Sequence, residues 1–393
     1  MSLRRIAPTL APLPLGALLR GAAALAGARA GASLVAEVAE ALGVPEVRGY
    51  ALGRAALAAA LETAMRATGR RGVVLPAFTS FSVAAAAARA GADVMLCDLD
   101  PVTLELDRAA LRACVGPGTA AVVLGNVFGR PDTTSDLGWI GAAGALLVDD
   151  AAQALGAAEG GRPAGSRGAL GVLSFGRGKC VSLGDGGALL VNDPALRGHT
   201  PAAPAAATRG AVPWLAACVL WACRSQSVFG LVSRSPGAQV GESHYAPEFA
   251  MAGPGAAVHA MAVGLGAEIA RQRAVRRAVA RWWVEGLAGV PGLRVPPEVP
   301  GTESAYLRLP VLAESAGHRE VLVGRLRAAR FSHVRSFPHP LDGIAEFRRF
   351  CGASPPVSEA AAIAQRLVAL PVHAGVDRGD VGRAVAALAP GPD

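Results

Sequence analysis

The sequence predicts an α/β protein: a large domain with a mostly parallel sheet flanked by helices, followed by a small α+β domain. Three observations support this fold class. Between residues 53 and 191, short apolar stretches typical of strands alternate with alanine-rich helical stretches. The strand-like stretches are apolar throughout, as in strands that are covered on both faces. Repeated βα units of this length place successive strands parallel to one another in a single sheet.

The composition is that of a globular chain with room for two domains. The 393 residues are 52% hydrophobic and 17% charged, which excludes a disordered chain. The net charge of +8 would suit a polyanionic partner or a phosphorylated small molecule. Because the arginines are scattered and only 5% of the residues are aromatic, we expect no nucleic-acid binding. The six cysteines lack the paired spacing of a zinc site, so we expect free thiols and no metal.

Two apolar stretches bear on the location of the protein. Residues 1–19 resemble a signal peptide, but Pro8, Pro12 and Pro14 interrupt the apolar run. The longest apolar run elsewhere, Ala211 to Cys223, has 13 residues and is too short to span a bilayer. We therefore expect a cytoplasmic protein. The second run is a candidate subunit interface, and membrane contact is the less favoured alternative.

The expected elements begin with two helices. One lies near residues 33–42, and a stronger helical pattern follows Gly53, where Leu57, Leu61 and Met65 recur every four residues. Downstream, the predicted strands are 73–75, 93–97, 120–124, 145–148, 169–175 and 188–191, with a helix that ends at 91 and another over 104–114.

These elements divide the chain into four parts. Residues 1–45 form an N-terminal arm, and the large domain takes residues 46–255 with an irregular insertion at about 201–240. A long connecting helix is expected over residues 256–290. The small domain takes residues 291–393, with a strand at 306–311 and helices near 319–329, 357–367 and 381–388.

Lys179 is the only lysine in the chain. A guanidinium group stays protonated at any working pH, whereas an ε-amine can lose its proton when desolvated and can then attack a carbonyl. A single retained lysine is therefore a candidate nucleophile. The alternative is a lysine that survived by chance on a solvated loop.

Two other groups lie where a ligand is expected. In a parallel sheet ligands sit at the carboxyl ends of the strands, and Asp149, Asp150 and Gln153 follow the strand at 145–148. The start of the helix at Gly53, Arg54 and Ala55 offers free backbone N–H groups for an anion, with the charge of Arg54 beside them. An ordinary amphipathic helix is the alternative interpretation.

An amine, a carboxylate and an anion site are the groups that pyridoxal 5'-phosphate (PLP) requires. Its aldehyde forms a Schiff base with an amine, and its pyridine nitrogen needs a carboxylate to stay protonated. Its phosphate needs helix N–H groups and hydroxyls. Each group is weak evidence alone, but their order along an alternating α/β chain is more specific.

Several segments resemble the DegT/StrS-type sugar aminotransferases, a branch of the fold-type-I PLP enzymes. Val148–Ala154 is similar to the E/D-D-A-A-Q-A motif of that family. Ser174-Phe175-x-x-x-Lys179, with the later Gly184–Gly187 turn, is similar to its S-F-x-x-x-K and G-[ED]-G-G motifs. Further similar segments, in the same order as in the family, are Leu75–Thr79, Asp98–Pro101 and Leu370–His373. The resemblance implies the fold-type-I architecture, with a seven-stranded large-domain sheet.

The resemblance also assigns residues to the cofactor. It implies that Lys179 forms the Schiff base, that Asp150 pairs with the pyridinium nitrogen and that Gln153 lies near the 3-oxygen. Ser174 and the backbone at Arg54 and Ala55 would hold the phosphate. Gln153 has an alternative role as the cap of a helix after the strand.

The chain departs from the family pattern at several positions. Ser80 stands where most members have an aromatic residue that stacks on the cofactor ring, so stacking is weaker or falls to Phe81. The family's N-Y-R-M segment, whose asparagine often reaches the phosphate in the neighbouring subunit, is Glu248–Met251 here. Arg177 is a further candidate for contact with the phosphate or an acidic substrate, and a solvated arginine is the alternative. The resemblance implies a homodimer with shared active sites.

Together these features predict an aminotransferase. The expected reaction moves an amino group from L-glutamate or L-glutamine to a keto group, most simply of a nucleotide-linked keto sugar. Related enzymes that dehydrate deoxysugars have histidine in place of the Schiff-base lysine, so Lys179 argues against that branch. Transfer to a non-sugar ketone or aldehyde, and a binding protein that kept the fold without turnover, are the alternatives.

Overall fold

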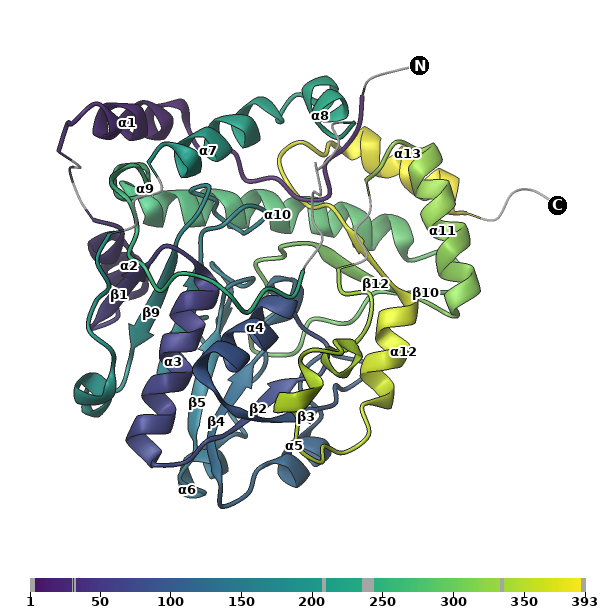
Figure 1. Cartoon of the computed structure of the whole chain (residues 1–393). Helices are drawn as coiled ribbons and strands as arrows, with labels where there is room; N and C mark the ends of the chain where they lie inside the picture. Colours follow the sequence, from purple (N-terminus) through teal and green to yellow (C-terminus); the bar gives the residue numbers. More distant parts are fainter. Residues whose placement is uncertain are drawn as a thin grey trace.

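The computed structural model describes residues 4–29, 31, 33–206, 210–234, 244–332 and 336–389. Its central feature is a seven-stranded sheet, covered by helices and ordered β1-β9-β8-β5-β4-β2-β3 (Figure 1). The strands are β1 (Val47–Tyr50), β2 (Gly72–Pro76), β3 (Asp93–Cys97), β4 (Thr119–Leu124), β5 (Leu146–Asp150), β8 (Leu170–Ser174) and β9 (Gly187–Val191).

In this sheet, β9 alone runs against the other strands. The neighbours from β3 to β8 pair in parallel, whereas β9 pairs antiparallel with both β8 and β1. The predicted mostly parallel sheet is therefore confirmed. Strand β1 was not predicted, because its Val-Arg-Gly-Tyr sequence has neither an apolar run nor strict alternation. It forms through pairing with β9, from Val47 opposite Leu190 to Tyr50 opposite Gly187.

Alternate residues of the central strands face different helices, which explains why these strands are apolar throughout. In β2, Val73 and Leu75 pack in the core under α3 and α4, whereas Val74 packs with α5 and α6 on the opposite face. The covering helices are α3 (Gly53–Thr68), α4 (Phe81–Ala90), α5 (Arg108–Cys114) and α6 (Gly138–Ala142). The predicted helix over 104–114 begins later, at Arg108, because the side chain of Asp107 caps its first turn.

The expectation of one continuous helix over residues 256–290 is wrong. The structure has two helices there, α9 (Ala256–Ala262) and α10 (Leu265–Leu287). Gly264 breaks the helix with a φ of 84°, a conformation that costs glycine little because it has no Cβ. As a result, α9 packs against α1 (Leu15–Leu25), while α10 runs on to the C-terminal part of the chain (Figure 1).

The arm and the insertion are more regular than expected. The arm contains the predicted helix as α2 (Leu34–Leu42) and the additional helix α1. The insertion contains α7 (Val212–Ala222) and α8 (Gln226–Val232). None of the helices in the described ranges combines the length and the hydropathy that crossing a bilayer requires.

The C-terminal residues form a second, antiparallel sheet with three helices. Its strands, in spatial order, are β10 (Leu293–Arg294), β12 (Leu309–Ala313) and β13 (Leu367–Leu370), and the helices are α11 (Ala316–Ala328), α12 (Ser358–Arg366) and α13 (Arg378–Leu388). A third small sheet joins β11 (Thr302–Glu303), β6 (Ala158–Glu159) and β7 (Arg162–Pro163). Ile6 of the arm bridges to Phe331, so the N-terminal arm is linked to the C-terminal part of the chain. The division into four parts stays a prediction.

Candidate active site

The carboxyl end of β5 carries two buried aspartates with different partners. Asp149 forms a fully buried ion pair with Arg167, with 2.6 Å between Oδ1 and Nη2. Asn126 holds both aspartates: its Nδ2 donates to Asp149 Oδ1 at 2.8 Å and to the carbonyl oxygen of Asp150 at 2.9 Å. Asp149 therefore has a structural role, and its network with Arg167 and Asn126 fixes the backbone from which the Asp150 side chain projects.

The Asp150 carboxylate is only partly satisfied. Oδ1 accepts the N–H of Ala152 at 3.0 Å, and Oδ2 has no hydrogen-bond partner among the residues that the structure describes. Burial raises the pKa of Asp150 to about 6, against the opposing effects of the Ala152 N–H and of the Lys179 charge. A buried carboxylate with an unused oxygen is suited to receive a hydrogen bond from a cationic ligand.

Lys179 lies in the turn after β8, next to the Asp150 site. Strand β8 pairs with β5, and Cys180 Sγ donates to the carbonyl oxygen of Gln153 at 3.1 Å, which ties the two turns together. Burial lowers the pKa of Lys179, and the nearby Asp150 carboxylate partly opposes this change. Two cations, Arg308 and Arg54, lower the Lys179 pKa further. A lysine with a lowered pKa can attack a carbonyl and carry protons near neutral pH.

The start of α3 and the end of β8 form a cradle in which a side chain on Gly53 has no room. A Cβ at Gly53 would lie 2.5 Å from Ser174 Cβ and 2.6 Å from Ser174 Oγ. The Ser174 hydroxyl is therefore held against the first turn of α3, where backbone N–H groups have no acceptor within the helix. The N–H of Ala55 is an exception, since it donates to the Leu52 carbonyl at 3.1 Å. The cradle thus centres on Gly53, Arg54 and Ser174.

The residues expected around the cofactor ring also contact other residues of the protein. Ser80 caps α4 by accepting the N–H of Ser82 at 3.3 Å. The Phe81 ring stacks on His339, with 5.0 Å between the ring centroids. Gln153 lies in a turn with no helix after it, so its alternative role as a helix cap is wrong. Its Oε1 instead accepts the N–H of Phe128 at 3.3 Å.

Arg54 links the cradle to the segment that replaces the N-Y-R-M motif. Its Nη1 donates to the carbonyl oxygen of Ala246 at 3.2 Å, and its guanidinium carbon lies 5.8 Å from the centroid of the Phe249 ring. Arg177 is exposed on the loop that carries Lys179.

Sequence reasoning missed three buried polar residues of the site: Asn126, Arg167 and Arg308. Arg308 has only one hydrogen bond, from Nη1 to Ser336 Oγ at 3.3 Å, and its Nε has no partner in the described part of the chain. Burial lowers the pKa of Arg308 to about 10, and the nearby Arg276 adds to the effect. An arginine inside the otherwise apolar stretch 306–311 was the available signal.

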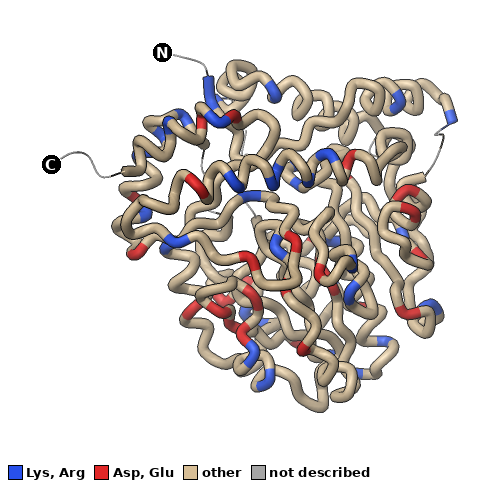
Figure 2. Tube along the Cα trace, turned by 180° about the vertical axis from the view of Figure 1, so that it is seen from behind, with Lys and Arg blue, Asp and Glu red and all other residues tan. Residues whose placement is uncertain are grey.

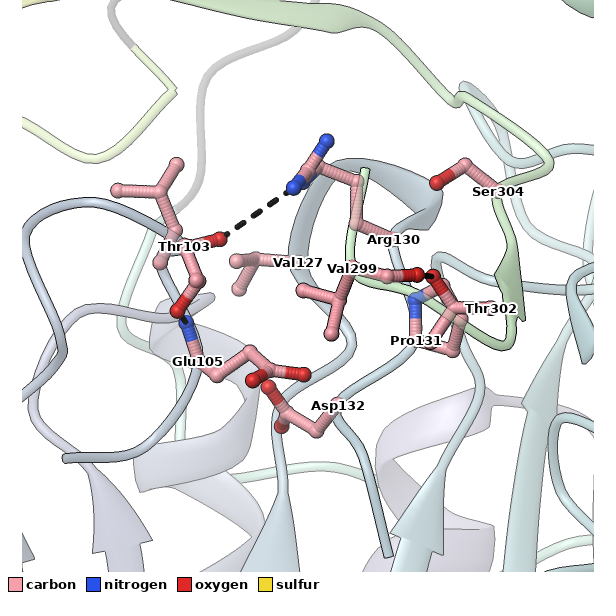
Figure 3. A pocket seen from close by; sticks show the side chains of 10 residues that line it. Thr103, Glu105, Val127, Arg130, Pro131, Asp132, Val299, Thr302 and Ser304 are labelled. Carbon is pink, nitrogen blue, oxygen red and sulfur yellow. Dashed lines mark hydrogen bonds between the residues drawn. The ribbon is translucent and has the colours of Figure 1, made fainter. Parts of the chain in front are cut away.

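A small pocket with a carboxyl pair lies beside this network (Figure 3). Glu105 and Asp132 point toward each other across it, below Arg130. Asp132 Oδ2 accepts the N–H of Gly125 at 2.8 Å, so it also holds the loop that carries Asn126. Burial and the Asp132 charge raise the pKa of Glu105 to about 7. None of the predicted site residues lines this pocket.

The groups present fit PLP on the features of this structure. The unused oxygen of Asp150 suits a pyridinium N–H, the lysine has a lowered pKa, and the cradle at Gly53 and Ser174 suits a phosphate. Fold and site together define a PLP-dependent enzyme of fold type I. All six cysteines are free, as predicted.

The chain belongs to the DegT/DnrJ/EryC1/StrS aminotransferase family, whose profile it matches over residues 19–389. It is 36% identical over 126 residues to a pleiotropic regulatory protein of Geobacillus stearothermophilus, covering 32% of this chain and 34% of that protein. It is 33% identical over 168 residues to the UDP-N-acetyl-3-dehydro-α-D-glucosamine 3-aminotransferase of Acidithiobacillus ferrooxidans, covering 42% of this chain and 45% of that protein. These matches span less than half the length of either relative.

Solved structures of the family resemble the chain over nearly its full length. The aminotransferase TlmJ from Streptoalloteichus hindustanus superposes with a TM-score of 0.72 at 25% identity and covers 97% of each chain. Enzymes of this family depend on PLP. The resemblance, the fold class and the cofactor inferred from the sequence are confirmed, whereas the roles of single residues stay predictions.

Proposed function

We propose that the protein uses PLP to transfer an amino group from L-glutamate or L-glutamine to the keto group of a nucleotide-linked sugar. The observation that carries this proposal is the buried Asp150 beside Lys179, a half-buried lysine of lowered pKa. The choice of acceptor rests on the Acidithiobacillus relative, whose printed name is that of an aminotransferase acting on a UDP-linked keto sugar.

Each site residue has one task in this reaction. When bound, PLP supplies an aldehyde that takes up the amino group and a ring that withdraws electrons from the reacting carbon. Lys179 Nζ holds the cofactor before the reaction and moves the proton to and from the substrate carbon during it. Asp150 keeps the proton on the ring nitrogen, while Ser174 Oγ and the first turn of α3 bind the phosphate. Gln153 Nε2 would donate to the 3-oxygen.

Arg308 is the group in this proposal that binds the carboxylate of the amino donor. A buried cation without a counter-ion is costly, so an arginine in that state is expected to gain an anionic partner on ligand binding. Arg308 has no carboxylate partner among the described residues and acts electrostatically on Lys179, where the donor reacts. The bidentate fork of an arginine matches a carboxylate.

Kinetics of the donor half of the reaction test this role. For Arg308→Gln we expect the KM for glutamate to rise by about tenfold to a hundredfold, since a charged hydrogen bond contributes about 1.5–3 kcal/mol. The PLP affinity should stay unchanged, and Arg177→Gln, which removes an exposed cation from the lysine loop, should leave the KM near the wild-type value. A loss of PLP affinity in Arg308→Gln would instead place this arginine on the phosphate.

The acceptor class is tested with ¹⁵N-labelled donors. The PLP-loaded protein is incubated with labelled glutamate or glutamine and with nucleotide-linked keto sugars, in parallel with small ketones and aldehydes. Label in the sugar supports the proposal, and label only in a small ketone or aldehyde supports the second candidate, a non-sugar acceptor. Failure of the donor to convert bound PLP to its amine form would favour a binding protein, in keeping with the printed name of the Geobacillus relative.

We also propose that two copies share their active sites and that the protein works in the cytoplasm. The segment at 246–249 that contacts Arg54 is suited to a shared site, because the matching segment of relatives reaches the neighbouring subunit. Light scattering of the PLP-loaded protein should give twice the mass of one chain. A monomer with full activity would contradict the shared site.

A further inference from the structure

The exposed apolar side chains of this protein are concentrated on three helices. Eight of the eleven large hydrophobic residues that are exposed in the described part of the chain lie on α1, α7 and α8. They are Leu15, Leu19, Leu25, Val212, Leu215, Val219, Val228 and Leu231. We call these three helices the apolar layer. Such a cluster is larger than the scattered apolar residues of an ordinary surface and marks an interaction site.

The three helices of the layer are joined to one another and cover the body of the protein. Trp214 of α7 donates from Nε1 to the Leu18 carbonyl oxygen of α1 at 2.9 Å, and Trp214 also fills the space beside Gly21. Phe229 of α8 packs with the N-terminal arm. Figure 1 shows the three helices along one edge of the molecule. Buried residues such as Leu18 and Ala217 face inward, so the exposed residues face away from the body.

The segments that build the layer carry cations and no anions. Residues 1–36 and 210–234 contain six arginines and no aspartate or glutamate. Figure 2 shows the lysines and arginines in blue and the aspartates and glutamates in red over the whole molecule. Two acidic residues of other helices, Glu268 of α10 and Asp380 of α13, are buried. They form ion pairs with Arg271 and Arg383.

We propose that the apolar layer docks on the surface of an anionic lipid bilayer. Exposed leucine and valine side chains flanked by arginines are what an interfacial helix presents to lipid, with the apolar residues entering the acyl boundary and the cations meeting the headgroups. Trp221, with the Arg224 guanidinium 3.7 Å from the centroid of its ring, has the amphipathic character of a residue at the headgroup level. The sequence alone favoured a subunit interface for this region, and the layer built by the three helices changes that preference.

The charge of the apolar layer favours a bilayer over a second copy of the chain as its partner. A two-fold interface brings the same surface of both copies together. In this layer arginines would then face arginines without a carboxylate to pair with them, which is unfavourable. An anionic lipid surface supplies the missing negative charge.

The layer is also attached to the loop that carries Lys179. Gly184 of that loop takes a φ of 82°, and a Cβ there would lie 1.9 Å from the carbonyl oxygen of Pro213 in α7. Gly178 lies against Thr9 of the arm, where a Cβ would be 3.2 Å from Thr9 Cγ2. Docking therefore places the lysine loop one helix layer from the membrane. This inference does not depend on which reaction the protein catalyses.

Vesicle flotation with the full-length, PLP-loaded protein tests the proposal. We expect the wild type to float with phosphatidylcholine vesicles that contain phosphatidylglycerol, and to stay at the bottom with pure phosphatidylcholine vesicles or at high salt. Leu19→Glu combined with Leu215→Glu should abolish flotation; these side chains are 61% and 51% exposed, so the fold tolerates the change. Val102→Glu combined with Val321→Glu is the matched control, since both are 50% exposed outside the layer, and it should float as the wild type does.

Two arginine variants test the electrostatic contribution to vesicle binding. Arg224 and Arg112 each lie over a tryptophan ring, at 3.7 Å and 4.7 Å from its centroid, but only Arg224 is in the layer. Arg224→Glu should weaken vesicle binding by at least about fivefold, the effect of one cation near an anionic surface, and Arg112→Glu should not. A wild type that stays unbound with anionic vesicles would overturn the proposal. So would a dimer that the Leu19→Glu, Leu215→Glu variant splits into monomers, because the layer would then be a subunit interface.

Discussion

The contact between Gly53 and Ser174 gives the sharpest test of the phosphate cradle. In Gly53→Ala the new Cβ would lie 2.5 Å from Ser174 Cβ, so the start of α3 and the end of β8 must move apart. Overpacking of this kind costs about 1–3 kcal/mol, while alanine gains about 1 kcal/mol over glycine in a helix. We therefore expect a small net change in the free energy of unfolding, between about zero and 2 kcal/mol of destabilisation.

The effect on the cofactor should be larger than the effect on stability. The Ser174 hydroxyl and the first turn of α3 can no longer meet one phosphate, and each charged hydrogen bond that is lost costs about 1.5–3 kcal/mol. This corresponds to a PLP affinity lower by at least about tenfold. The affinity is measured by titrating the apoprotein with PLP and following the absorbance of the bound cofactor, and stability by urea unfolding of the apoprotein.

Two further variants make the result decisive. Gly324 is exposed within α11 and a Cβ there meets no atom within 4 Å, so Gly324→Ala should stabilise the protein by about 0.5–1 kcal/mol and leave PLP binding unchanged. Ser174→Ala should weaken PLP binding without the steric cost. If Gly53→Ala and Ser174→Ala both bind PLP with wild-type affinity, the phosphate does not occupy this cradle.

Three other predictions concern buried charges. Burial raises the pKa of Asp150 to about 6, so the stability of the apoprotein should fall by up to about 3 kcal/mol as the pH rises from about 4 to above 6. In urea unfolding, Asp150→Asn should remove this fall. The same variant should lower the transamination rate at least about a hundredfold. The pKa of Glu105 is raised to about 7, so the stability of the protein should also fall as the pH rises through about 7. Glu105→Gln should therefore raise the melting temperature relative to the wild type at pH 8 and not at pH 5. An equal shift at both pH values would contradict the raised pKa. Arg167→Met leaves Asp149 buried without its counter-ion and should cost about 3–5 kcal/mol, whereas Arg66→Ala, which breaks an exposed pair, should cost under about 1 kcal/mol; equal costs would show that the buried network does not hold β5.

The parts of the fold that could be predicted are those that local sequence decides. Strands such as β3 and β5 are apolar on both faces and are bounded by glycine or acidic turns, and a lone lysine in a family motif stands out against arginines. Strand β1 could not be predicted, because an edge strand forms through its pairing with β9 and needs no apolar run of its own. The break at Gly264 was hidden by the helical periodicity on both of its sides.

Sequence reasoning could predict the residues expected to contact the cofactor directly, but not the residues that hold them in place. Asp150 and Ser174 end strands and Lys179 lies in the turn after one, so their position at the sheet edge follows from the topology. Asn126 and Arg167 reach the site from loops, 23 and 18 residues away from Asp149, and only the folded structure brings their side chains to it. Ala55 was expected to offer a free N–H, but a tight first turn in α3 engages it.

The central claim is that Lys179 carries the cofactor. Because the chain contains a single lysine, reduction of the PLP-loaded protein with borohydride, followed by proteolysis and mass spectrometry, has one expected outcome: the reduced cofactor is attached at Lys179. In Lys179→Arg, which keeps the positive charge, no stable attachment should remain. Full loading with PLP without a label at Lys179, or with a label only at the terminal amino group, would contradict the account.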